Sequence, residues 1–133
     1  MIDVESQIFK AVSDAVLAEY PTAFVVGKES RAPAKFPCLS VVEYDNWILE
    51  RTQDSTHNEN HVGVMYTLTA YSNNAKSGKA ECKSILAIAD EVMLSLGFTR
   101  TRARPLSMDD ATKYRMLARY EAVIGKDETI YRR

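Results

Sequence analysis

The chain has 133 residues, a formal net charge of −1 and a hydrophobic fraction of 46%, which indicate one globular domain with a single core. This composition excludes a disordered chain, and the longest strongly apolar run, Ile85–Ala89, is too short to span a membrane. The N-terminus lacks the layout of a secretory signal, so we expect a cytoplasmic start, and two cysteines without a C-x-x-C motif predict free thiols.

Apolar residues recur at helical spacing in two segments and alternate with polar residues in several others. In chain order the sequence predicts a helix at 3–19, strands at 23–26, 38–44, 47–49 and 61–71, a helix at 79–96, and strands at 99–104 and 112–124. Pro21 and Gly97 end the two helices, and Asp45-Asn46 has the composition of a turn. This order predicts an α+β fold: a mostly antiparallel or mixed sheet of four to six strands with two helices packed on one face.

Two of the predicted strands are long for a domain of this size. The thirteen residues 112–124 would span about 40 Å at about 3.3 Å per residue, whereas a sphere of this chain length is about 36 Å across. We therefore expect long strands to project past the core. Apolar side chains also recur on their second face, and we expect a second copy of the chain to cover part of it. These side chains are Met65, Tyr71, Leu117 and Val123.

The motifs in the chain do not support catalysis or metal binding. His57 and His61 are four residues apart, but Asn58 stands where a zincin helix needs its glutamate. The five glycines are too scattered for a phosphate-binding loop, and Ser77–Ala80 lacks the first glycine and the hydroxyl of a Walker A motif. Asp109-Asp110 is expected to form an acidic turn. We therefore expect a protein that is not an enzyme and that uses no cofactor and no metal.

Charge is unevenly distributed along the chain. Residues 1–98 carry 8 basic and 13 acidic side chains, whereas residues 99–133 carry 9 basic and 5 acidic ones. The basic residues recur at alternate positions, which predicts one cationic stripe across two strands. The stripe comprises Arg100, Arg102, Arg104, Lys113, Arg115 and Arg119. It would bind either nucleic-acid phosphates or the acidic portion of a neighbouring copy; Tyr114 and Tyr120 alternate onto the other face, which favours the neighbouring copy.

Five segments together resemble one family of phage proteins. They are FPCLSVVEYDN (36–46), NENHVGVMYTLTAYSN (58–73), KAECKSILAIADEVMLSLGF (79–98), YRMLARYEAVI (114–124) and IYRR (130–133). They resemble the tail-terminator (tail-completion) proteins of long-tailed bacteriophages and phage-tail-like bacteriocins, over most of the chain and without a catalytic signature. The resemblance implies a subunit that closes into a hexameric ring on the last ring of the tail tube, ends tail elongation and offers a docking surface to the head.

The resemblance also implies partners and a location. The partners are further copies of the chain, the tail tube protein, a head-tail connector or neck protein, and DNA that passes through the lumen without sequence specificity. The location is the virion tail, after a stage in the cytoplasm of the bacterial host. Two alternatives stay open: a connector or neck subunit, and a small nucleic-acid-binding module that uses the arginine stripe.

A projecting arm at 45–60 is the candidate contact with a neighbouring subunit or with the tube. Its apolar anchors would be Trp47, Ile48 and Leu49, and Arg51 follows them in the same segment. Burial of Trp47 within its own sheet is the alternative to this role. The two interpretations predict different surroundings for the indole ring.

Overall fold

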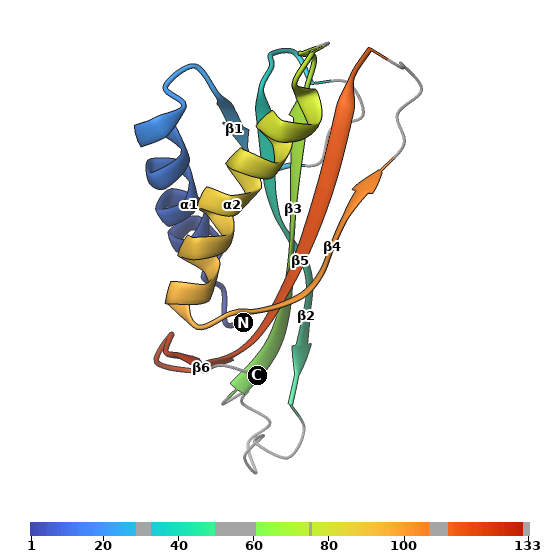
Figure 1. Ribbon diagram of the computed structural model, residues 1–133. Helices are drawn as coiled ribbons and strands as arrows, with labels where there is room; N and C mark the ends of the chain where they lie inside the picture. The colour runs from blue at the N-terminus through green and yellow to red at the C-terminus, as the bar shows by residue number, and fades with distance from the viewer. Residues whose placement is uncertain (29–32, 50–60, 75, 107–111, 132–133) are drawn as a thin grey trace.

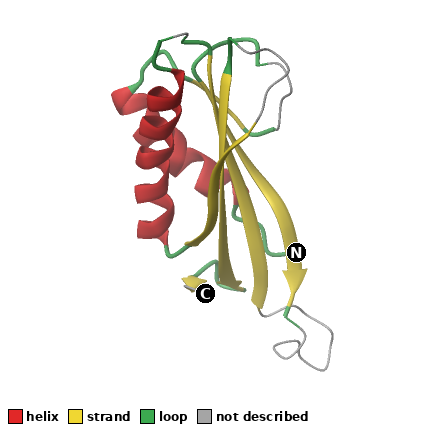
Figure 2. Ribbon diagram, turned by 45° about the vertical axis from the view of Figure 1, so that its right-hand side comes forward, coloured by secondary structure: helices red, strands yellow, loops and turns green. Residues whose placement is uncertain are grey.

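Two helices lie on one face of a six-stranded sheet (Figures 1 and 2). The computed structural model describes residues 1–28, 33–49, 61–74, 76–106 and 112–131. In chain order they form α1 (Glu5–Glu19), β1 (Phe24–Val26), β2 (Cys38–Ile48), β3 (His61–Ser72), α2 (Gly78–Leu96), β4 (Thr99–Leu106), β5 (Tyr114–Gly125) and β6 (Ile130–Tyr131). The strand order is β1-β2-β3-β5-β4, with β6 paired to β5. Only the β1–β2 pair is parallel among these strands, which confirms the predicted α+β fold with a mixed sheet.

Each helix buries one apolar stripe against the sheet. In α1 the stripe is Ile8, Val12 and Val16, at the four-residue spacing that places side chains on one side of a helix. α2 ends where the sequence predicts, because Gly97 adopts a left-handed conformation with a φ of 108°. The Phe98 N–H then donates to the Met93 carbonyl at 3.0 Å, which satisfies a carbonyl in the last turn of the helix.

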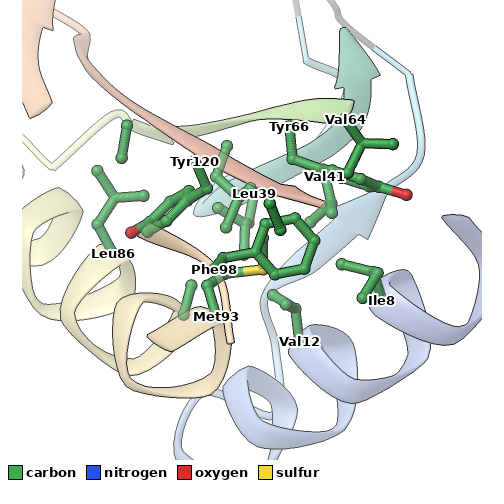
Figure 3. Close-up of a cluster of buried hydrophobic side chains, with 14 of the residues drawn as sticks. Ile8, Val12, Leu39, Val41, Val64, Tyr66, Leu86, Met93, Phe98 and Tyr120 are labelled. Atoms are coloured by element: carbon green, nitrogen blue, oxygen red, sulfur yellow. The ribbon is translucent and has the colours of Figure 1, made fainter. Parts of the chain in front are cut away.

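The core lies between the helices and the sheet, and its largest members are aromatic (Figure 3). The rings of Phe98 and Tyr66 meet edge to face, with centroids 5.4 Å apart and planes at 81°. The hydroxyl of buried Tyr120 donates to Asp90 Oδ1 on α2 at 2.6 Å. The contact between Phe98 and Tyr66 therefore holds the start of β4 against the middle of the sheet. The hydrogen bond between Tyr120 and Asp90 fixes α2 over β5.

The two cysteines are free thiols inside this structure. Cys38 on β2 and Cys82 on α2 are both fully buried. Burial raises the pKa of the Cys38 thiol to about 11. Burial, with a smaller contribution from the Glu81 carboxylate, raises the pKa of the Cys82 thiol to about 12. Both therefore remain protonated at neutral pH.

The predicted turn at Asp45-Asn46 is wrong, because β2 continues through it to Ile48. The pairing register with β3 shifts between Glu43 and Asp45, so Tyr44 is the extra residue of a β-bulge. The side chains that suggested a turn satisfy local backbone groups instead: Asp45 Oδ1 accepts the Asn46 N–H at 2.8 Å. Residues 47–49 consequently extend the same strand, and residues 50–60 of the predicted arm, Arg51 included, lie outside the described residues.

The long strands extend beyond the helices at one end of the molecule. β3 and β5 each contain 12 residues, so each spans about 40 Å. In Figures 1 and 2 the end of β2 and the start of β3 lie past the ends of both helices. The projecting strand ends agree with the expectation from strand length, and they place the last residues of β2 away from the core.

Candidate functional site

The sheet face opposite the helices, here called the open face, carries most of the predicted interaction residues. On β3 the core takes alternate residues from Val62 to Ala70, which leaves Gly63 to Tyr71 at the intervening positions on the open face. The predicted interface residues on β3 and β5 all occupy open-face positions, as the alternation indicates. They are Met65, Tyr71, Leu117 and Val123.

These four residues differ in how much surface they leave for a partner. Tyr71 is fully buried and Leu117 is only 7% exposed within the single chain, whereas Met65 and Val123 are half-buried. The segment after β1 approaches this end of the open face, because Ser40 Oγ donates to the Lys28 carbonyl at 3.1 Å. Coverage by a second copy stays a prediction, and it now concerns mainly Met65 and Val123.

Trp47 lies against its own sheet. It is half-buried and pairs with Gly63 of β3. A Cβ atom at Gly63 would stand 2.2 Å from Cε2 of the indole, so the ring occupies the space that any other residue would fill. This placement corresponds to the alternative interpretation of Trp47, in which the indole is buried within its own sheet. Ile48 next to it is 45% exposed, and the Leu49 N–H donates to the His61 carbonyl at 3.2 Å.

The prediction that Arg100, Arg102 and Arg104 share one face of β4 is wrong. The register between β4 and β5 shifts between Arg100 and Arg102, so Thr101 is an extra residue that reverses the alternation. Arg100 lies on the helix side, where its Nη1 contacts Asp90 Oδ1 of α2 at 3.1 Å. Arg102 and Arg104 pair with open-face residues of β5 and are exposed.

A basic patch nevertheless forms on the open face. Its members are Arg102, Arg104, Arg115 and Arg119. The Arg119 guanidinium lies over the ring of Tyr44, 4.9 Å from its centroid, and Lys113 Nζ lies 5.3 Å from the ring centroid of Phe36. Tyr44 was not among the predicted site residues, although its alternation with Ser40 and Val42 places it on the same face as Arg119.

A small cavity of about 50 Å³ opens beside this pair. It is lined by Ser40, Val42, Tyr44, Thr67, Thr69, Leu117 and Arg119. Two buried polar atoms, Thr67 Oγ1 and Arg119 Nε, have no hydrogen-bond partner among the described residues. The cavity is large enough for water molecules to serve both atoms, so water explains it better than a specific ligand.

A cluster of carboxylates, here called the acidic edge, lies along β2 and the N-terminal segment beside it and is formed by Asp3, Glu5, Glu43 and Asp45. Asp3 Oδ1 accepts the Glu5 N–H at 2.9 Å, and Glu5 Oε2 accepts the Glu43 N–H at 2.8 Å. Burial raises the pKa of Glu43, the hydrogen bond from Asn46 lowers it, and the charges of the other three carboxylates raise it further. Ionised Glu43 is therefore disfavoured in the folded protein.

Replacing Glu43 with glutamine should raise the melting temperature at pH 7, because the substitution removes a charge that folding disfavours. The folded pKa of Glu43 lies above its ordinary value of 4.5, so the protonated carboxyl favours folding below pH 4.5, and this contribution is lost as pH rises through the folded pKa. The gain should consequently disappear in acid. Thermal unfolding at pH 7 and below pH 4.5 measures the gain in melting temperature, with exposed Glu91→Gln as control. An unchanged melting temperature at pH 7 contradicts the prediction.

The described residues offer little to a metal ion. They contain no group of three or more His, Cys, Asp and Glu side chains placed to hold one. His57 lies outside the described residues, and the half-buried ring of His61 lies 5.7 Å from that of Tyr131. Within the same residues, neither α1 nor α2 combines the length and apolar content that a membrane-crossing helix requires.

Comparison with known proteins gives no assignment. No protein-family model matches the sequence, and no curated protein matches it significantly.

Proposed function

We propose that the chain is a structural virion protein, without enzymatic activity, that forms a ring on the tail tube of a bacteriophage or a prophage-derived tail. The ring would end tail elongation and provide the surface at which head and tail join. One observation carries the proposal: the helices cover a single face of the sheet, and the other face exposes apolar side chains where the strands project.

These apolar side chains lie together near the end of β2. On the open face Tyr44 is 61% exposed, and Trp47, Met65 and Val123 are half-buried close by. Ile48, which is 45% exposed, projects from the helix side at the same end of β2. An antiparallel sheet commonly faces water on one side, but that side is then mainly polar. Aromatic and aliphatic side chains with a charged rim are typical of protein interfaces. A second copy, or the last ring of a tube, would bury this surface.

Sedimentation of the purified protein, together with electron microscopy, tests the proposal. We expect closed rings, with six copies as the size that the resemblance implies. Ile48→Gln should weaken assembly, whereas Leu17→Gln on the outer face of α1, where the leucine is 37% exposed, should leave it unchanged. A protein that stays monomeric at its highest soluble concentration and does not bind added tail tubes contradicts the proposal. A neck or connector subunit, the alternative within this class, would form rings without binding the tube end.

A second candidate function, non-specific nucleic-acid binding, is favoured by the basic patch. Its four arginines share one face, and the ring of Tyr44 lies on the same face within reach of a stacked base. A salt-dependent gel shift of duplex and single-stranded DNA is expected, and it should be lost in the Arg115→Ala/Arg119→Ala variant. Lys76→Ala/Lys79→Ala removes the same charge from exposed positions elsewhere and should retain the shift. The absence of binding at low salt contradicts this function.

A further inference from the structure

α2 leaves one strand of the sheet uncovered, and a groove of about 240 Å³ lies there between α2 and β4. Its apolar lining is Leu86, Ala87, Ala103, Met116 and Ala118. Lys83 and the Arg100–Asp90 ion pair form its charged rim. In Figure 1, the upper end of α2 lies in front of β3, whereas β4 runs from the lower end of α2 to the far side of β5. The groove therefore offers an apolar floor with positive charge at its margin.

β4 is also an edge of the sheet. It is the last strand in the order, and no described strand pairs with its outer side. Its residues from Arg100 to Pro105 are all exposed, and Arg102 and Arg104 point to the open side. An exposed edge of this length presents backbone groups to another chain, and its charged side chains determine which partner surfaces it attracts.

The opposite edge of the sheet has the complementary character. β1 pairs only with Cys38–Ser40, so the rest of β2 borders no described strand on that side. Ile48 pairs with the core residue Val62 and so projects to the helix side, whereas Tyr44 and Asp45 lie on the open side. The Glu43 and Asn46 N–H groups already have carboxylate acceptors, so a partner here would be held mainly by side chains.

Within the described residues, the carboxylates of the acidic edge have neutral hydrogen-bond partners. Glu5 N–H, Glu43 N–H, Asn46 Nδ2 and Asn46 N–H donate to Asp3, Glu5, Glu43 and Asp45 respectively. No cationic side chain in the described part of the chain forms an ion pair with any of the four. Among the described residues mutual repulsion is therefore left uncompensated at this edge, and positive charge from a second copy would relieve it.

We propose that the β4 edge and its groove bind the acidic edge of a second copy of this chain. Ile48 of one copy enters the groove of the next on the helix side, where Glu5 approaches the rim residue Lys83. On the open side, Asp45 meets Arg102 and Arg104. Successive strand pairs from β2 to β4 are all antiparallel, so β2 and β4 run in opposite directions. A second copy in the same orientation thus continues the antiparallel order of the sheet.

Because this contact joins two different surfaces, it can repeat from copy to copy. The copies close into a ring when the rotation between neighbours is a whole fraction of a full turn. The inference rests on the proposed function, since it names the surfaces through which a ring would form. Charge complementarity selects a second copy over a nucleic acid as the occupant of the β4 edge. A nucleic acid would use Arg102 and Arg104 but would be repelled by the acidic edge and has no group for the apolar groove.

Charge reversal at each edge tests the inference. The first variant is Arg102→Glu/Arg104→Glu, and the second is Asp3→Lys/Asp45→Lys. Each should raise the concentration at the midpoint of assembly about tenfold or more when it is alone, because like charges then face each other across the contact. An equimolar mixture should assemble again, since each edge of one variant meets an edge of opposite charge on the other.

Controls separate this contact from folding and from total charge. Lys76→Glu/Lys79→Glu makes the same change in charge as the arginine variant, at exposed positions outside both edges, and should assemble as the wild type does. Circular dichroism checks the fold of each variant, because Asp3 is the acceptor for the Glu5 N–H. Ala87→Gln is a second test that leaves charge unchanged: it places a longer polar side chain at an exposed position in the groove and should also weaken assembly.

The outcomes distinguish the inference from the function on which it rests. Assembly of both variants at wild-type concentrations, or a mixture that fails to restore assembly, overturns the edge contact and leaves the ring proposal standing. A wild type that never assembles overturns both. Loss of DNA binding in the arginine variant with unchanged assembly assigns these arginines to nucleic acid and also overturns the contact.

Discussion

Replacing Phe98 with alanine should lower the free energy of unfolding by about 3–5 kcal/mol, the range for removing a fully buried aromatic side chain. Phe98 has no exposed surface, and its ring meets that of Tyr66 edge to face. Phe98 also follows Gly97, whose left-handed backbone ends α2. The end of α2 therefore cannot easily shift toward the sheet to fill the cavity that the substitution leaves. Chemical denaturation measures the loss from the transition midpoint and slope.

The matched control is Phe24→Ala on β1. Phe24 is half-buried in a strand of three residues at the margin of the sheet, so its removal leaves a smaller cavity and should cost much less. Equal losses for the two substitutions would mean that Phe98 is not the centre of the packing between helices and sheet. A loss below about 1 kcal/mol for Phe98→Ala would lead to the same conclusion.

Replacing Gly63 with alanine is the second substitution with a large expected effect. The new methyl group would overlap the indole of Trp47, so the ring must leave the sheet surface or the strands must separate. Overpacking of this kind costs about 1–3 kcal/mol. Trp47 is the only tryptophan in the chain, so its fluorescence should shift to longer wavelength as the ring becomes solvated.

A double-mutant cycle isolates this contact. In a Trp47→Ala background the space over Gly63 is vacant, and alanine is a better strand residue than glycine. Gly63→Ala should then be neutral or stabilising, and the interaction free energy between the two positions should be large. Destabilisation by Gly63→Ala of similar size in both backgrounds would show that the backbone, and not the indole, requires glycine at position 63.

The helices and the long strands could be predicted because each carries a regular pattern over many residues. α2 and β5 keep their apolar periodicity for 19 and 12 residues, so several matching positions outweigh any single exception. The ends were equally predictable where the chemistry is specific: Gly97 has the left-handed backbone expected of a residue that follows a helix. The two-layer arrangement then follows from the order of these elements.

The two β-bulges could not be predicted in this way. A bulge adds one residue to a strand without a characteristic residue type, and every position beyond it changes face. Thr101 therefore separates Arg100 from Arg102 and Arg104. The acidic edge was also missed, since it brings the N-terminal segment beside Glu43, about 40 residues away, through contacts that no local pattern encodes.

Because Cys38 and Cys82 are enclosed in the core, introduced cysteines can be cross-linked selectively in assemblies of this chain. A maleimide or disulfide reagent reaches neither sulfur unless the subunit opens, because both thiols are buried and remain protonated. Cysteines introduced at Arg104 and at Asp45 would thus be the sole reactive pair in the native protein. Cross-linking between them would report which surfaces of adjacent protomers touch, with the natural thiols left in place.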